Sequence, residues 1–434
     1  MTALVLRALS TALWLVLNVF LARTLPTGQL SLVLYVINAS LLLAHVTVMG
    51  FNTPMLRAGA RHWQLGERGA FRALLFEARA VVAGAVLVLA LGLAFLAALN
   101  LTGPLSGFAG AAVALGVATG LTAMMIVQAE ALRATGQLAR ALVGVACTRI
   151  VATLGFCGAF WIIEDLSAVT VLLSYCAALA LAAGCEAVWL ARACAGQERQ
   201  RGAAKAWREA LVSWPGEVGG VTLMRGSVVV LGAAGDLSLV AVFLIADRVA
   251  TLSRFPTDAV RAAAAPRLAR AAPPGRADET LQRAVSETSG WFVLAGGAGL
   301  ASVALTGGGL LAIFGPEFRD GLALLWILLL AHGAWVVFGP TGLVLSMAGL
   351  SALRSGVTCG VAVLMLVAQI VLLPVVGVLG LAALFCTACW VLNSALWLVI
   401  RLRLGVRCGL FGVRLSEFLH GLRSTRIALA VERT

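Results

Sequence analysis

The chain has 434 residues, of which 61% are hydrophobic and only 12% are charged, and its mean hydropathy is +1.00. In soluble domains roughly a quarter of the residues are charged. This composition excludes a soluble enzyme, a secreted disulfide scaffold and a disordered chain, and it leaves no room for a separate soluble catalytic domain.

The net charge of +13 could indicate binding to nucleic acid, but the placement of the basic residues argues against it. They gather in short segments between apolar runs, where they contact anionic headgroups and fix orientation. Lys205 is the only lysine among 32 basic residues, a bias that favours a bacterial source. The nine cysteines lie in or beside apolar runs, and no metal or cofactor is expected.

Apolar runs long enough to cross a bilayer recur along the whole chain. A membrane-spanning helix needs about 20 apolar residues, and the runs predict an all-α polytopic membrane protein with about 12 transmembrane helices. The predicted spans are 4–22, 29–49, 80–99, 109–128, 141–163, 167–190, 209–232, 237–255, 286–305, 320–347, 352–373 and 377–400.

The distribution of positive charge predicts the orientation of these spans. The segments after the even-numbered spans, with the C-terminal tail, carry 26 basic residues, whereas those after the odd-numbered spans carry only Arg23 and Arg319. Because basic residues favour the cytoplasmic side, both termini are predicted to be cytoplasmic. The localisation expected for such a chain is the bacterial inner membrane.

The two halves of the sequence resemble each other. Segments 134–144 and 347–356 each end a span, turn on a glycine and place an arginine at the start of the next span. This repeat predicts two six-helix bundles related by a pseudo-two-fold axis along the membrane normal, with a substrate cleft between them. The predicted parts are an N-terminal lobe 1–195, a cytoplasmic linker 196–208, a C-terminal lobe 209–400 and a basic cytoplasmic tail 401–434.

Several short motifs, in their order and spacing, resemble one family over almost the whole chain. They are LARTLPTG at 21–28, LRATG at 132–136, ADRV at 246–249, IFGPEF at 313–318 and the stretch 373–383. The sequence resembles the polysaccharide-export flippases, of the O-antigen type, in the multidrug/oligosaccharidyl-lipid/polysaccharide exporter superfamily.

That resemblance implies a transporter and not an enzyme. Its substrate would be a polyprenyl-pyrophosphate-linked oligosaccharide, moved from the inner to the outer leaflet by alternating access for the synthesis of a cell-surface polysaccharide such as lipopolysaccharide. The implied partners are this lipid-linked glycan and the bilayer, with a polysaccharide polymerase and glycosyltransferases nearby.

Charged side chains inside predicted spans are candidates for the substrate site, because each costs about 2.5–3.5 kcal/mol at mid-membrane on insertion scales. Arg248 in span 8 is expected to hold a pyrophosphate, with Asp247 beside it to orient or titrate; the alternative is an ion pair that only fixes packing. Glu217 and Arg225 lie eight residues apart in span 7, beside Pro215, and suggest a flexible gate. The alternative is a kinked structural helix in which Arg225 extends toward the membrane surface.

Four further residues complete the candidate substrate-binding set. Arg149 in span 5 either faces the cleft or extends toward the cytoplasm, and Asn18 and Asn38 either line the cleft or bond across helices. Arg57 lies at the inner mouth and could meet an anionic headgroup or simply anchor the chain. Glu186, near the cytoplasmic end of span 6, is expected at the membrane interface.

Two other functions are open from the sequence. The first is a cation-coupled multidrug exporter of the same superfamily, although spans 1 and 2 contain no carboxylate and the first acidic residue is Glu67. The second is an integral membrane glycan polymerase or glycosyltransferase, although the predicted outer loops are short. The acidic residues of those loops are Glu164, Asp165, Asp236, Glu317 and Asp320.

Overall fold

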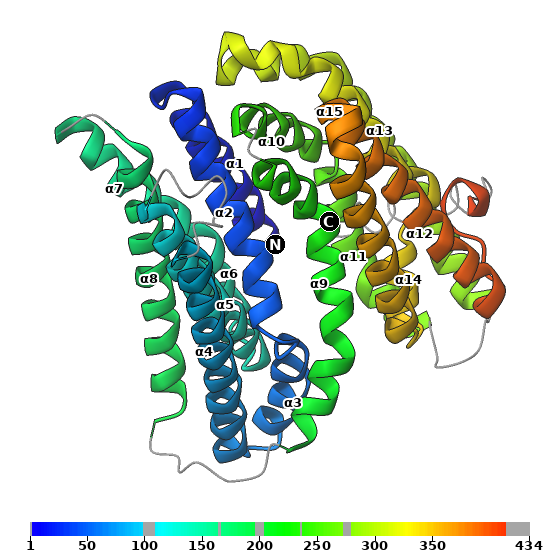
Figure 1. Cartoon of the computed structure of the whole chain (residues 1–434). Coiled ribbons are helices and arrows are strands. Elements are labelled where there is room, and N and C mark those ends of the chain that lie inside the picture. The colour runs from blue at the N-terminus through cyan, green and yellow to red at the C-terminus, as the bar shows by residue number, and fades with distance from the viewer. Residues whose placement is uncertain are drawn as a thin grey trace, which may run out of the picture. The chain divides into compact units, whose positions relative to one another are not determined.

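In the computed structural model, the residues described are 2–98, 109–163, 166–195, 204–234, 237–271 and 279–413. This part of the chain is almost entirely helical and contains no strand (Figure 1). Seven of its helical segments are long and apolar enough to cross a membrane, and two shorter apolar helices, Leu9–Thr24 and Arg149–Ile163, accompany them.

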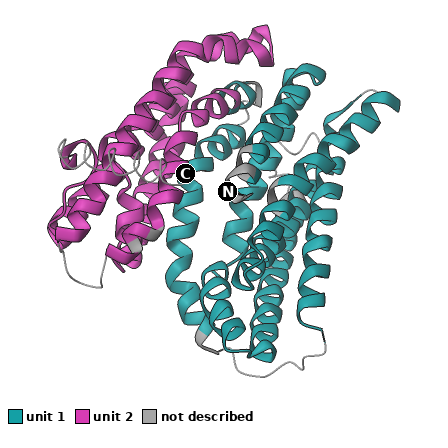
Figure 2. Cartoon of the chain, turned by 180° about the vertical axis from the view of Figure 1, so that it is seen from behind, with its two compact units in different colours: residues 1–244 teal, residues 245–434 magenta. Residues whose placement is uncertain are grey.

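The chain divides into two compact units, Met1–Leu244 and Ile245–Thr434 (Figure 2). The division into lobes around the linker 196–208 stays a prediction. The first unit extends beyond that linker because helix α9 packs along α2 and α3. Its helices are α1 (Thr2–Thr24), α2 (Thr27–Thr47), α3 (Asn52–Gln64), α4 (Arg68–Ala98), α5 (Ala109–Ala134), α6 (Leu138–Leu142), the π-helix η2 (Val143–Thr148), α7 (Arg149–Ile163), α8 (Ala168–Ala193), α9 (Ala204–Ala233) and the first half of α10 (Leu237–Leu252).

The second unit begins inside α10. Its further helices are α11 (Phe255–Ala271), α12 (Glu279–Phe314), η3 (Pro316–Gly321), α13 (Leu322–Phe338), α14 (Thr341–Met347), α15 (Ser351–Leu404) and η4 (Gly409–Gly412). The tail 414–434, predicted to be a basic cytoplasmic segment, lies outside the described residues.

Two glycines divide helical segments in this unit. The predicted span 320–347 is interrupted at Gly339, which has a φ of 73° and is followed by Pro340, so it forms α13 and α14. Helix α15 contains both of the last predicted spans, divided at Gly377, whose φ is 62°. The Nε2 atom of Gln369 reaches the carbonyl oxygen of Leu381 at 3.4 Å, so the chain folds back on itself at Gly377.

Two amphipathic helices were not predicted, because their basic residues suggest connecting segments. In α3, Met55 and Gly59 are buried, whereas Arg57 and Arg61 are exposed on the opposite face. In α11, which follows α10 after a short turn, Ala264 and Leu268 are buried whereas Arg267 is exposed. Residues at i and i+4 lie on one face of a helix, which explains how so short and polar a segment still contributes to the core.

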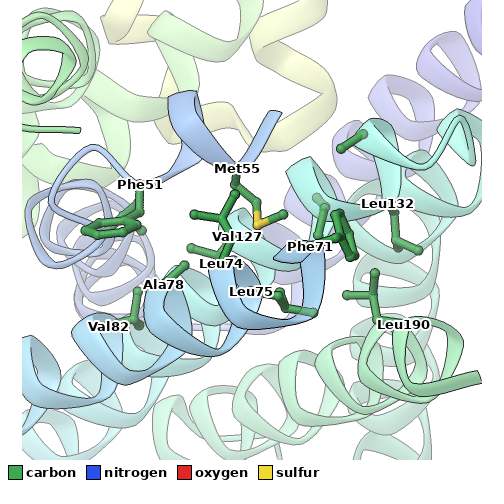
Figure 3. Close-up of a cluster of buried hydrophobic side chains, with 14 of the residues drawn as sticks. Phe51, Met55, Phe71, Leu74, Leu75, Ala78, Val82, Val127, Leu132 and Leu190 are labelled. Atoms are coloured by element: carbon green, nitrogen blue, oxygen red, sulfur yellow. The ribbon is translucent and has the colours of Figure 1, made fainter. Parts of the chain in front are cut away.

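Buried side chains of α3, α4, α5 and α8 form a core cluster in the first unit (Figure 3). Met55 and Phe71 are fully buried there with Leu132. Phe51, in the turn before α3, contacts the ring of Trp207 on α9 edge to face, with 4.9 Å between centroids. The turn between α2 and α3 is thus held in the core on one side and against α9 on the other.

Candidate functional site

Helix α9 carries two of the predicted site residues, Glu217 and Arg225, and both side chains are half-buried. Pro215 lies inside this helix. Proline lacks a backbone N–H and its ring opposes the preceding turn, so the helix is weakened just before Glu217. Glu217 and Arg225 contact different parts of the α2–α3 segment, and both contacts lie within the first unit.

Arg225 is hydrogen-bonded to Asn38 in the middle of α2. Its Nη1 donates to Oδ1 of Asn38 at 2.9 Å, while Nδ2 of Asn38 donates to the carbonyl oxygen of Leu34 at 2.7 Å. Asn38 is completely buried. The amide oxygen thus orients a guanidinium group within an apolar segment of the chain. The sequence left open whether Asn38 lines the cleft or bonds across helices, and in the structure it bonds across helices.

Glu217 is held by the first turn of α3. Both Asn52, through Nδ2, and Thr53, through Oγ1 at 2.8 Å, donate hydrogen bonds to its carboxylate. The first backbone N–H groups of a helix have no partner within it, and the N-terminus carries a partial positive charge. The negative charge of Glu217 is therefore stabilised by two side chains and by the dipole of a 13-residue helix.

Residues of α9 before Glu217 hold the end of α2. Nε1 of Trp214 donates to the carbonyl oxygen of Val46 at 3.1 Å, and Oγ of Ser213 donates to that of Gly50 at 3.3 Å. Gly50 has a φ of 76°, and a Cβ there would collide with the carbonyl oxygen of Ala210. We call this set of contacts, made by residues 210–217 of α9 with residues 46–53, the α9 clasp.

Asp247 and Arg248 lie in the second unit, on α10, and both are half-buried. Two residues after α10, the guanidinium of Arg254 lies over the ring of Trp335 on α13, 4.4 Å from its centroid. Arg254 was not singled out in the sequence, because a basic residue at the end of a span suggests anchoring at the membrane surface. An arginine that stacks on an aromatic ring is a further candidate for this part of the site.

The remaining candidates lie apart from the α9 clasp or at its edge. Arg149 begins α7 and its guanidinium lies 5.8 Å from the ring centroid of Trp14 on α1. Asn18 is buried, but its Nδ2 donates to the carbonyl oxygen of Trp14 in its own helix at 2.6 Å. Arg57 is exposed on α3 and forms an ion pair of 3.5 Å with Glu209 of α9. Among these three residues, Arg57 is the one for which the described part of the chain shows an ion pair with α9.

Comparison with known proteins shows which solved structures share this fold. No protein-family model matches the sequence, and no curated protein matches it. Among solved structures, the inward-facing conformation of a multidrug resistance MATE family transporter of the MOP superfamily is similar, with a TM-score of 0.65, 16% identity and coverage of 91% of this chain and 94% of that one. The outward-facing conformation of such a transporter aligns with a TM-score of 0.61, 16% identity and coverage of 93% and 94%. A MATE structure in complex with MaD3S gives 0.60, 17% identity and 93% of both chains.

These likenesses establish a MATE-like fold. They confirm the predicted fold class, an all-α membrane protein whose spanning helices form two bundles, and the chain is a multi-pass membrane protein. The similar structures come from the superfamily that the sequence motifs indicated. Membership of the polysaccharide-export flippases within it stays a prediction, as do the orientation of the termini and the roles of the predicted site residues.

Proposed function

We propose that this protein is a membrane transporter that works by alternating access, of the multidrug exporter type. The observation that carries the proposal is the similarity of more than nine-tenths of the chain to both an inward-facing and an outward-facing multidrug resistance transporter. A fold that is known in both states in other proteins is suited to exposing one site to each side of the membrane in turn. The expected location is the cytoplasmic membrane of a bacterium.

The α9 clasp is the proposed moving part. Its contacts are polar and few, and they end at a helix that Pro215 weakens. The polar contacts of the clasp can be exchanged for contacts with water, whereas the apolar contacts of the cluster around Met55 cannot. We therefore assign Glu217 the role of a latch that holds the α2–α3 turn in one conformation and releases it in the other.

Transport of an organic cation by the reconstituted protein tests this proposal. Liposomes that contain the wild-type chain should accumulate a fluorescent organic cation under an imposed ion gradient, above the level of protein-free liposomes. Glu217→Gln should slow accumulation about tenfold, because an amide is a weaker acceptor than a carboxylate for Asn52 and Thr53. The matched control is Glu287→Gln, which removes a carboxylate from the Arg267 ion pair of the other unit and should leave transport unchanged. Dye levels equal to those of empty liposomes would reject the exporter.

The second candidate function is a flippase for a polyprenyl-pyrophosphate-linked oligosaccharide. The observation that favours it is an arginine inside an apolar helix, Arg225, which Asn38 of α2 holds in place. The fork-shaped guanidinium group matches the oxygen atoms of an anionic pyrophosphate. A polysaccharide polymerase and glycosyltransferases would then act beside it. Complementation of a flippase-deficient strain tests this candidate: rescue by the wild type but not by Arg225→Ala, at equal protein levels, supports it. Failure of the wild type to rescue would reject it.

A further inference from the structure

Helix α4 begins with three arginines on one side. Arg68, Arg72 and Arg79 occupy positions that lie within about 40° of one another around the helix axis, at 3.6 residues per turn. Arg68 and Arg72 are exposed, whereas Arg79 is half-buried. We call these three residues the α4 arginine stripe. Three positive charges thus lie together along the first turns of a helix that is long and apolar enough to cross a membrane.

The acidic residues near the stripe in the sequence do not neutralise it. Oε2 of Glu67 lies 2.6 Å from Nδ1 of His62, which is its partner. Glu77 lies on α4 itself, but about 160° around the axis from Arg79. In the described part of the chain, neither Arg68 nor Arg79 forms an ion pair. The stripe is therefore a place that attracts an anionic group.

The guanidinium group of Arg79 has two enclosed N–H donors. Among the described residues, neither Nε nor Nη2 has a hydrogen-bond partner, and both atoms are shielded from solvent. A buried donor without a partner is costly, and the cost is higher for a charged group. The N–H bonds of Nε and Nη2 point from the same edge of the planar group, which is the geometry that binds two oxygen atoms of one anion. Arg79 is thus arranged to bind a phosphate or a carboxylate side on.

The stripe lies beside the end of α8. Cys194 follows the last residue of that helix, outside the apolar span, and belongs to the same buried cluster as residues of α4. Burial raises the pKa of the Cys194 thiol, and the charges of all three arginines of the stripe act in the opposite direction. The three guanidinium groups are therefore close enough to act on one point. The C-terminus of α8 supplies only about half a negative charge, so it balances a small part of the stripe.

The length of α4 sets the depth of Arg79 in the membrane. The part of α4 from Arg79 to Ala98 is about 30 Å long at 1.5 Å per residue, which equals the thickness of the hydrocarbon core of a bilayer. Arg79 therefore lies where the hydrocarbon meets the headgroups. The phosphate groups of phospholipids lie in that layer, so a lipid phosphate reaches the stripe without leaving its own depth.

The helix also offers an apolar surface next to the stripe. Only 11% of the apolar stretch of this span is buried in the protein. Phe76 and Leu87 are exposed and lie within about 60° of Arg72 around the helix axis. An acyl chain attached to a bound phosphate can lie along this surface, whereas free phosphate has no part that contacts it. These features together favour a lipid as the source of the anionic group.

We propose that the α4 arginine stripe binds the phosphate group of an anionic phospholipid whose acyl chains lie along the exposed face of α4. Arg79 donates two hydrogen bonds, through Nε and Nη2, and Arg72 and Arg68 contribute positive charge. A lipid with a net negative charge is favoured over a zwitterionic one, because the stripe repels the ammonium of a zwitterionic headgroup. Basic sites between membrane helices recognise anionic headgroups in this way. The proposal does not depend on the proposed transport function, since lipid binding is measured without any transported substrate.

Native mass spectrometry of the purified full-length chain tests the site. In detergent that contains equal amounts of phosphatidylglycerol and phosphatidylcholine, the wild type should retain phosphatidylglycerol preferentially. Arg79→Gln should weaken this binding about tenfold, because it removes a charged donor of two hydrogen bonds. Arg79→Lys keeps the charge but not the planar edge, and its binding should lie between the two. Equal retention of phosphatidylglycerol by the wild type and Arg79→Gln would overturn the proposal.

The matched control is an arginine outside the stripe. Arg283 is exposed on α12 of the other unit and forms an ion pair of 3.1 Å with Glu279. Arg283→Gln removes the same charge from the protein as Arg79→Gln, and it should retain phosphatidylglycerol as the wild type does. A loss as large as that of Arg79→Gln would show that the lipid responds to net charge alone, which would also overturn the site.

Thermal unfolding and competition by phosphate separate the bound lipid from other causes. Phosphatidylglycerol should raise the midpoint of unfolding more for the wild type than for Arg72→Gln, an exposed substitution on the same stripe that leaves the core intact. An equal rise in both proteins would show that the stripe does not bind the lipid. Inorganic phosphate in large excess should leave phosphatidylglycerol bound to the wild type, because it lacks acyl chains. Displacement of the lipid would overturn the lipid assignment in favour of free phosphate.

Discussion

The side chain of Gln282 on α12 holds both backbone polar groups of Arg407. Its Nε2 donates to the carbonyl oxygen of Arg407 at 3.0 Å, and its Oε1 accepts from the N–H of the same residue at 2.8 Å. Two residues further on, the N–H of Gly409 donates to Oγ of Ser289 at 3.0 Å. The chain that follows α15 is thereby bound to α12 through its backbone.

Removal of this amide should loosen the segment 405–413. Gln282→Ala deletes two hydrogen bonds, each of which contributes about 0.5–1.5 kcal/mol, so we expect a loss of about 1–2 kcal/mol in the free energy of unfolding and faster cleavage of this segment by protease. Gln137→Ala is the control, because Gln137 accepts only an exposed contact from Arg140. Equal rates of cleavage in both variants would show that the amide does not hold the segment.

A comparison of alanine substitutions at Gly50 and Gly66 separates the cost of a collision with α9 from the cost of backbone strain. Both have a φ of 76°, but a Cβ at Gly50 collides with α9 whereas none of the surroundings of Gly66 lies within 4 Å. Gly66→Ala should cost about 1–2 kcal/mol for the left-handed backbone, and Gly50→Ala should cost about 1–3 kcal/mol more for the collision. Thermal unfolding in detergent measures both. Equal losses would contradict the contact with Ala210.

Arg225 and Asn38 should be coupled energetically. In a double-mutant cycle of Arg225→Gln and Asn38→Ala, we expect an interaction of about 0.6–2 kcal/mol in the free energy of unfolding, the range found for polar contacts between membrane helices. The control cycle pairs Arg225→Gln with Asn18→Ala, because Asn18 bonds its own helix. Its two changes should be additive. A coupling energy near zero in the first cycle would show that the hydrogen bond between Arg225 and Asn38 does not contribute to stability.

The ring of Trp335 should stabilise the charge of Arg254. Trp335→Leu removes the aromatic face and should lower the free energy of unfolding by about 1–3 kcal/mol, including lost packing, whereas Trp335→Phe keeps a weaker face and should recover part of that loss. Chemical denaturation of the purified chain distinguishes the two. The stacking is unimportant if the phenylalanine variant is no more stable than the leucine variant.

The spans were predictable because lipid and protein interior both select for apolar residues. The run 29–49 predicts a span that the structure places at Thr27–Thr47, and Gly377 divides the last pair. Helices α3 and α11 were not predicted, because their basic residues are typical of connecting segments. The early start of α4 at Arg68 was also not predicted. Hydropathy reports how apolar a segment is, and an amphipathic helix has a low average although one face is buried.

The members of the candidate site were easier to predict than their partners. Arg225 and Asn38 both stood out as polar residues in apolar runs, but they are 187 positions apart, and nothing in either run indicates the other. Asn52 was missed because the sequence predicts a connecting segment there, in which a polar residue needs no distant partner. Glu186 was judged by its depth in the span. In the structure it is fully buried beside Gly144, in a π-helical turn of a different segment, and such a turn leaves no pattern in the sequence.

The fold-back at Gly377 has a consequence for how the protein is made. One left-handed residue joins the last two spans, and no polar connection between them is suited to a place in water. We therefore expect the pair to enter the lipid together during synthesis, as one helical hairpin.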